Sequence, residues 1–219
     1  MSVHNVFDGY FVLGLEMQRY LLKSVSDAID AVSQLQQPNS LAFMEEAANM
    51  LTNCFKAGNK VIIAGNGGSL CDGAHFAEEL TGVFRAIRPA LPAISLSEPG
   101  HITCVGNDLG FDWVFARGVE AFGKPGDIFV GLTTSGNSAN IVNAFETAER
   151  LEMQSMAFLG KTGGKLKGVA DIELLIEGFA TSDRIQEAHM AAIHIIIEMV
   201  EHLMFSHKVA STGDSLLIN

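Results

Sequence analysis

The chain has 219 residues, 48% of them hydrophobic, and a formal net charge of −11 at pH 7. This length suits one domain, or one domain with an added helical arm, and the acidic balance disfavours nucleic acid and anionic membrane as partners. A phosphate ligand would need local backbone amides and hydroxyls, because the overall field repels it.

A long helical arm is predicted at the start of the chain. Residues 10–35 carry apolar side chains at the spacing of one helix face, namely Leu13, Met17, Tyr20, Leu21, Val25, Ala28, Ile29 and Val32. We expect residues 1–58 to form an N-terminal helical arm and residues 59–206 an α/β domain. Residues 207–219 have little to pack against and are expected to fray.

A second helix is predicted over about residues 40–57. Pro38 disfavours helical backbone just before it, and Asn39 or Ser40 can supply the N-terminal cap. Gly58 follows the last apolar position and can adopt the left-handed conformation that ends a helix.

From residue 60 onward, short apolar runs alternate with helical stretches. The runs are KVIIAG (60–65), PAISL (92–96), DIFVGLTT (127–134), SMAFLG (155–160) and DIELLI (171–176). Such continuous runs suit strands that are covered on both faces, so the alternation predicts a doubly wound, five-stranded parallel sheet. A closing helix over about 183–205 is apolar nearly all round and is expected to be buried.

The first strand leads into a glycine-rich loop. Gly65, Gly67 and Gly68 let backbone amides approach a ligand without obstruction by a Cβ atom. Ser69 can cap the helix that follows, whose N-terminus offers unpaired N–H groups to an anion. An ordinary tight strand-to-helix turn is the alternative reading.

A second loop of the same kind is TTSGNSAN, at residues 133–140. It places four hydroxyls beside Gly136, those of Thr133, Thr134, Ser135 and Ser138. Ligands of open α/β sheets bind at the carboxyl ends of the strands, where both loops would lie. Helix capping alone is the alternative for either loop. Together the two loops, which contain no basic residue, predict a phosphate cradle built from neutral donors.

Two helices carry side chains suited to proton transfer. His75 and Glu79 are four residues apart and share a helix face, although such a pair is often a simple surface contact. His194 lies among apolar residues of the closing helix, where an imidazole needs partners for its nitrogens. Either it is a core histidine satisfied by a carbonyl, or it meets Glu79 and Gln186 across a cleft.

Six motifs resemble those of one family. In chain order they are AGNGGS, HFAEELTG, CVGNDLGF, TTSGNSAN, KTGGKL and DRIQEAHMAAIH, spread over about residues 40–205. The chain is similar in these motifs to the bacterial phosphoheptose isomerases, which have the sugar isomerase (SIS) fold. Six ordered motifs over three quarters of the chain are far more specific than any one of them.

The resemblance implies a cytoplasmic homotetramer with active sites between subunits. Its reaction would be enediol proton transfer from D-sedoheptulose 7-phosphate to D-glycero-D-manno-heptose 7-phosphate, for ADP-heptose and lipopolysaccharide core biosynthesis. Glu79 and His194 would be the acid–base pair. One zinc ion per subunit would bind His75, Glu79, Gln186 and His194. The residues implied to contact the substrate are Asn66, Gly67, Gly68, Ser69, Asn107, Asp108, Thr133, Thr134, Ser135, Ser138, Asp183 and Gln186.

The sequence departs from the family pattern at three places. Val83 replaces an arginine that is usual in the family, with Arg85 and Arg88 nearby. Leu70 stands where a histidine is common, and Gly73 lowers the helix propensity of its segment. These departures leave the exact sugar open.

Two other functions fit the same fold. One is a non-catalytic adaptor of replication initiation, but such relatives lack the glutamate after HFA and the late histidine, which are present here as Glu79 and His194. The other is an isomerase or sensor of another phosphosugar. Conversion of sedoheptulose 7-phosphate would separate these readings from a phosphoheptose isomerase.

Three cysteines, Cys54, Cys71 and Cys104, complete the inventory. Their number is odd and their spacing matches no metal site, so buried reduced thiols are expected. The first residues lack a basic region, and no apolar run approaches about 18 residues. The compartment expected is the cytoplasm.

Overall fold

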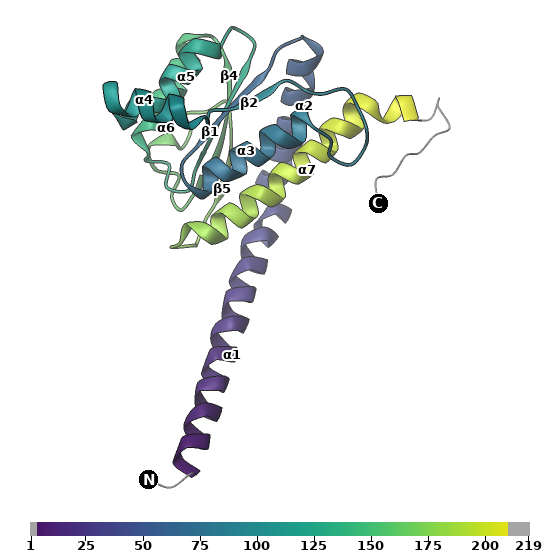
Figure 1. Cartoon of the computed structure of the whole chain (residues 1–219). Helices are drawn as coiled ribbons and strands as arrows, with labels where there is room; N and C mark the ends of the chain where they lie inside the picture. Colours follow the sequence, from purple (N-terminus) through teal and green to yellow (C-terminus); the bar gives the residue numbers. More distant parts are fainter. Residues whose placement is uncertain (1–3, 210–219) are drawn as a thin grey trace.

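The computed structural model describes the backbone of residues 4–209 and the side chains of residue 14 and residues 16–206 (Figure 1). The predicted tail at 207–219 therefore lies almost wholly outside the described residues.

A five-stranded parallel sheet forms the centre of the molecule. Its strands are β1 (Val61–Gly65), β2 (Ala93–Ser95), β3 (Ile128–Thr133), β4 (Gln154–Gly160) and β5 (Ile172–Ile176). Their order is β2-β1-β3-β4-β5, and every neighbouring pair is parallel. The predicted doubly wound sheet and all five strands are confirmed. The chain turns outward in opposite directions from β1 and β3, so a topological switch point lies between them.

Two layers of helix cover the sheet (Figure 1). On one face pack α2 (Pro38–Lys56), α3 (Gly68–Thr81) and α7 (Ser182–Val209), and on the other α4 (Pro99–Asp108), α5 (Val114–Phe122) and α6 (Ala139–Arg150). Short 3-10 turns are η1 (Gln34–Gln36), η2 (Phe111–Trp113) and η3 (Gly164–Leu166). Strand side chains alternate between the layers: Ile63 joins the first core and Ile62 the second.

Helix α3 packs closely on the sheet because of a glycine. A Cβ atom at Gly73 would lie 2.9 Å from the Ile63 side chain, closer than real Cβ atoms come. Gly73 lowers the helix propensity of α3, but only a residue without a Cβ atom lets α3 pack this closely against β1.

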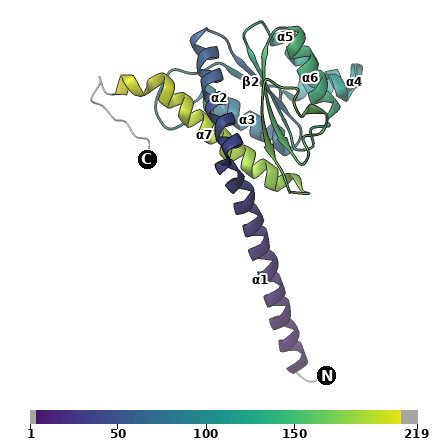
Figure 2. The same ribbon diagram turned by 180° about the vertical axis from the view of Figure 1, so that it is seen from behind.

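The N-terminal helix α1 (His4–Ser33) extends away from the sheet layers, as both views show (Figures 1 and 2). Its predicted apolar face is exposed in the single chain: Tyr20, Leu21 and Val25 are 65%, 58% and 57% exposed. This much apolar surface on one helix is unusual for a monomer.

The start of α2 corrects one expectation. Gln37, in extended backbone, occupies the N-cap position, and Pro38 is the first helical residue. Capping by Asn39 or Ser40 is therefore wrong, because proline needs no N–H at this position and its fixed φ suits the first turn. Gly58 has φ of +78° just after the helix, as predicted.

The expectation of buried cysteines holds for one of three. Cys54 is buried, and burial raises the pKa of its thiol to about 11. Cys71 and Cys104 are exposed, because they lie on solvent-facing sides of α3 and α4. All three thiols are free.

The closing helix α7 is buried along its inner face only. Ile193, Ile196 and Ile197 are in the core, whereas Met199 and Leu203 on the outer side are exposed. By length and composition, residues 182–206 could cross a membrane, with a mean hydropathy of 1.3. A core helix of a soluble protein passes the same test, and the inner face of α7 packs in such a core.

One histidine of α7 is part of this core. His189 is fully buried, and its Nε2 atom lies 2.9 Å from the carbonyl oxygen of Leu159, to which it donates. Its Nδ1 atom has no hydrogen-bond partner among the described residues. Burial lowers the pKa of His189 from 6.5 to about 4.

Stability should therefore depend on pH through His189. The unfolded state binds the imidazole proton more tightly than the folded state does. The contribution of neutral His189 to the free energy of unfolding is therefore complete above about pH 6.5, and it falls by roughly 3 kcal/mol as the pH drops towards 4. His189→Gln keeps an N–H donor without titrating. Denaturant titrations should show the parent's advantage over this variant shrinking from pH 7 to pH 4. An advantage that does not change with pH contradicts a neutral buried imidazole.

Candidate active site

A polar cavity of about 300 Å³ opens at the carboxyl ends of β1 and β3. It lies at the switch point of the sheet, where open α/β folds bind ligands. Among the described residues, those that line it carry no formal charge: Asn66, Gly67, Gly68, Ser69, Leu132, Thr133, Thr134, Ser135, Ser138, Ser182 and Gln186. The two predicted loops thus meet in one cavity.

The hydroxyls of these loops are not used as helix caps. The N-cap of α3 is Gly67, and Ser69 lies inside the helix, where its Oγ accepts from Gln186 Nε2 at 3.3 Å. Capping by Ser69 is therefore a wrong expectation. Ser138 does precede α6, yet within the described part its side chain makes no cap bond and lies 3.3 Å from the Thr133 hydroxyl.

Glycines allow the first loop to close over the cavity. Gly67 has φ of +57°, a left-handed conformation that other residues rarely adopt. A Cβ atom at Gly68 would lie 2.6 Å from the Gln186 side chain, and one at Gly65 would lie 2.4 Å from the Ser69 carbonyl oxygen. The glycine spacing thus lets the loop, α3 and α7 approach one another.

A pair of amide side chains joins the two loops. Asn66 Nδ2 donates to Asn140 Oδ1, and Asn140 Nδ2 donates to Asn66 Oδ1, both at 2.9 Å. Asn140 is buried at the start of α6. Sequence reasoning missed its role, because no local pattern shows that residues 74 positions apart exchange hydrogen bonds.

The KTGGKL segment, residues 161–166, packs against the second loop on the side away from the cavity. Gly136 has φ of +64°, and a Cβ atom there would collide with the Gly163 carbonyl oxygen. The backbone N–H of Lys165 donates to Asn137 Oδ1 at 3.1 Å, and that of Leu166 to the Gly136 carbonyl at 3.2 Å. This motif therefore shapes the cavity without lining it.

The start of α7 adds a hydroxyl that sequence reasoning missed. Ser182 lines the cavity, and its Oγ lies 2.9 Å from the Thr134 hydroxyl. The neighbouring Asp183 does not line it; its side chain is 56% exposed, and a hydrogen bond from Thr181 lowers its pKa. Ser182 and Asp183 are neighbours at the start of α7, so the sequence alone does not show which of the two side chains points into the cavity.

Two further predicted contacts lie outside the cavity of the single chain. Asn107 and Asp108 are exposed at the end of α4, and Asn107 Nδ2 donates to Asp108 Oδ1 at 2.7 Å. Their contact with a substrate stays a prediction.

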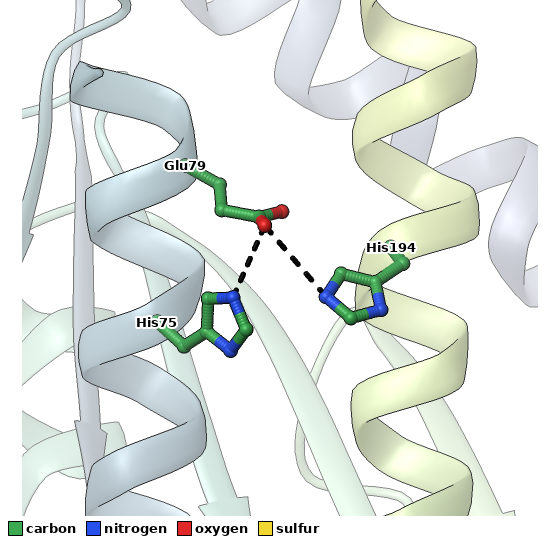
Figure 3. A group of neighbouring side chains, drawn as sticks. All are labelled: His75, Glu79 and His194. Atoms are coloured by element: carbon green, nitrogen blue, oxygen red, sulfur yellow. Dashed lines mark hydrogen bonds and ion pairs between the residues drawn. The ribbon is translucent and has the colours of Figure 1, made fainter. Parts of the chain in front are cut away.

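The predicted acid–base residues face one another between α3 and α7 (Figure 3). Glu79 Oε1 lies 3.1 Å from His75 Nε2 and 3.8 Å from His194 Nε2. The Glu79 side chain is 14% exposed, and its Oε2 atom is buried without a protein partner in the described part of the chain. Of the two readings for His194, the structure favours the one in which it meets Glu79.

This cluster has the donor set of a metal site. One ligand atom from each of His75, Glu79 and His194 lies within 4.8 Å of the others. Two imidazoles and a carboxylate are a set that catalytic zinc sites use, with a fourth position left open. Gln186, the other predicted ligand, turns its amide to Ser69 instead.

A second carboxyl group lies on α3 one turn before His75. Burial raises the pKa of Asp72 to about 6, while the charge of His75 opposes this rise. Its Oδ2 atom has no partner among the described residues. The sequence pattern did not single it out.

Comparisons with known proteins identify the family of the chain. Residues 22–160 match the family model of the SIS domain. The chain is 56% identical to the phosphoheptose isomerase of Fusobacterium nucleatum over 161 residues, 74% of this chain and 82% of the relative. It is 47% identical to that of Vibrio cholerae over 190 residues, 86% of this chain and the whole relative.

Solved structures of the same kind superpose on this fold. The phosphoheptose isomerase of Neisseria gonorrhoeae aligns with a TM-score of 0.78 and 33% identity, over 84% of this chain and 99% of that one. The enzyme of Francisella tularensis gives 0.76 and 34%, over 85% and 97%. With this identity along most of its length, the chain belongs to the phosphoheptose isomerase family of SIS-domain enzymes.

Proposed function

We propose that the enzyme converts D-sedoheptulose 7-phosphate to D-glycero-D-manno-heptose 7-phosphate. The observation that carries this proposal is the pairing of Glu79 with His194 across two helices that also border a hydroxyl-lined cavity. The family supplies the class of sugar, since the relatives are phosphoheptose isomerases.

The cavity and the acid–base pair suit two ends of one elongated substrate. Ser69 and Glu79 stand ten residues apart on α3, which separates them by about 15 Å along the helix. A seven-carbon sugar with phosphate on the last carbon places its anion and its carbonyl at opposite ends of the chain. Neutral hydroxyls and helix N-terminal amides hold the anion in a protein whose net charge is −11.

The proton steps require one base and one acid. One member of the Glu79–His194 pair removes a proton from C1 of the ketose, and the C2 carbonyl oxygen gains a proton, which gives the enediol. C2 then takes up a proton while the C1 hydroxyl loses one, and the aldose results. A carboxylate and an imidazole are both suited to such transfers near neutral pH.

We also propose that His75, Glu79 and His194 hold one zinc ion per subunit, with Gln186 as the fourth predicted ligand. The arrangement of three ligand atoms within 4.8 Å supports this site. When bound, the ion would supply polarisation of the carbonyl group. The unpartnered Glu79 Oε2 leaves one carboxylate oxygen available for proton transfer.

A homotetramer with active sites between subunits is the assembly that we propose. The exposed apolar face of α1 and the outer face of α7, with Leu41 of α2 beside it, supply the interface. Apolar surface of this extent normally marks association.

The proposed cellular role follows from the product. A heptose 7-phosphate made in the cytoplasm would enter ADP-heptose synthesis and, from there, the lipopolysaccharide core. The membership of the family supports this role.

Removing either member of the acid–base pair should abolish turnover. Glu79→Gln and His194→Ala should each lower kcat by about 10²- to 10⁴-fold, because positioned proton transfer typically contributes that much. Rates with sedoheptulose 7-phosphate and circular dichroism spectra check this. A folded Glu79→Gln or His194→Ala protein with near-parental kcat contradicts the assignment.

The metal site is tested separately by elemental analysis of the parent and of His75→Ala, with less zinc expected in the variant.

Changes in the cradle should act on KM instead. Ser69→Ala removes a hydrogen bond to a charged group, worth roughly 1.5–3 kcal/mol, and should raise KM about tenfold or more. Asn140→Asp places a second acceptor opposite Asn66 Oδ1 and should act in the same direction. Ser33→Ala, an exposed hydroxyl of α1, is the control. If KM stays at the control value in both cradle variants, the phosphate is bound elsewhere.

The assembly is tested by sedimentation at micromolar concentration, where the parent should be a tetramer. Leu21→Glu and Met199→Glu place a charge in each exposed apolar face and should give smaller species that remain folded. Lys23→Gln, two residues after Leu21 but already polar, should leave the tetramer intact. A monomeric parent protein rules out this assembly.

A further inference from the structure

The loop between α3 and β2 runs past the acid–base pair and along α7. Phe84 in this loop stacks on the imidazole of His194, with ring centroids 5.9 Å apart and an interplanar angle of 20°. Four residues later, the side chain of Arg88 turns back into the protein and is only 2% exposed. A buried guanidinium needs partners for its charge and its N–H groups.

Arg88 donates to four partners: two backbone carbonyls of α3, the carboxylate of Glu201 and the carbonyl of the neighbouring Pro89. Its Nη2 donates to the carbonyl oxygen of Glu79 at 2.6 Å and its Nη1 to that of Leu80 at 2.8 Å. Both belong to the last turn of the helix, whose carbonyls lack helical partners. Its Nε donates to Glu201 Oε1 at 2.8 Å.

Glu201 connects this arginine to the helix of His194. It follows His194 by seven residues, which is two turns, so both side chains leave the same side of α7. Its carboxylate is almost fully buried, and its other oxygen accepts from the backbone N–H of Arg85 at 3.4 Å. The ion pair therefore joins the backbone of Glu79 to the helix that carries its partner.

A buried ion pair adds little net stability, because desolvation offsets most of the attraction. Its geometry, however, is well defined, since the planar guanidinium fixes the directions of its donors. The Glu79–His194 contact, 3.8 Å between atoms of two different helices, depends on the spacing of those helices. Arg88 is bonded to both helices close to this contact.

We propose that Arg88, through Glu201, is a positioning residue that sets the separation of Glu79 and His194. The proposal rests on the acid–base roles proposed above for these two residues. Arg88 is not proposed to touch the substrate. Its effect reaches the reaction only through the placement of the Glu79 backbone and of α7.

The same loop provides a matched control. Arg85 pairs with Glu198, again between this loop and α7, but the two side chains are 59% and 36% exposed. Exposed ion pairs contribute little, so Glu198→Gln should leave kcat and KM near the parental values.

The test compares kcat and KM with sedoheptulose 7-phosphate in three variants. Arg88→Lys keeps the charge without the forked donors, Glu201→Gln keeps an acceptor without the charge, and Arg88→Met/Glu201→Leu removes both charges together. Removing both avoids an unpaired buried charge, so this protein should fold. We expect kcat to fall by about 10- to 100-fold, the scale of a displacement near 1 Å, with little change in KM because the cradle lies at the far end of α3.

The outcomes separate the possible explanations. A loss confined to kcat in folded Glu201→Gln and in the double variant supports positioning. A parental kcat in either folded variant, or a rise in KM as large as the fall in kcat, overturns it. Glu79→Gln measured alongside keeps the two proposals apart. If that variant retains kcat, the acid–base roles fail; if it loses kcat while the Arg88 and Glu201 variants do not, only positioning fails.

Discussion

The packing of α3 against α7 is the constraint on which the rest of the site depends. The two helices run side by side over the same face of the sheet (Figure 1). Contacts join them at successive levels: Gln186 with Ser69 near the cavity, then His194 with Glu79. Finally Glu201 pairs with Arg88 of the following loop, which donates to the last carbonyls of α3. One helix pair thus arranges the proposed phosphate cradle, the proposed acid–base pair and the buried ion pair along a single axis.

The topology of the sheet determines where this axis begins. The chain leaves β1 and β3 in opposite directions, and the loops after these two strands form the walls of the cavity. Because the cavity wall carries hydroxyls and amides, an acidic protein can bind an anion without a basic residue there. The Asn66–Asn140 amide pair joins the two walls through a pair of reciprocal hydrogen bonds.

Sequence patterns could predict the strands, the two loops and the Glu79–His194 pair, because each depends on local periodicity or on motifs shared with a known family. Contacts across long sequence separations could not be predicted, and Asn140 and Ser182 were missed for that reason. The helix cap at Gln37 was misplaced because a proline at the first helical position competes with the usual polar caps. Periodicity predicted the apolar face of α1, but periodicity alone does not show that this face is exposed in the single chain.

Transfer of a proton through the enediol of a seven-carbon ketose phosphate can be followed by isotope exchange. The enzyme is incubated with sedoheptulose 7-phosphate in D₂O, and mass spectrometry and NMR identify the product and the position of any deuterium. We expect an aldoheptose 7-phosphate that carries deuterium at C2, because the proton passes through a side chain that exchanges with solvent. No aldoheptose product, or a product without any deuterium at C2, would overturn the proposed mechanism.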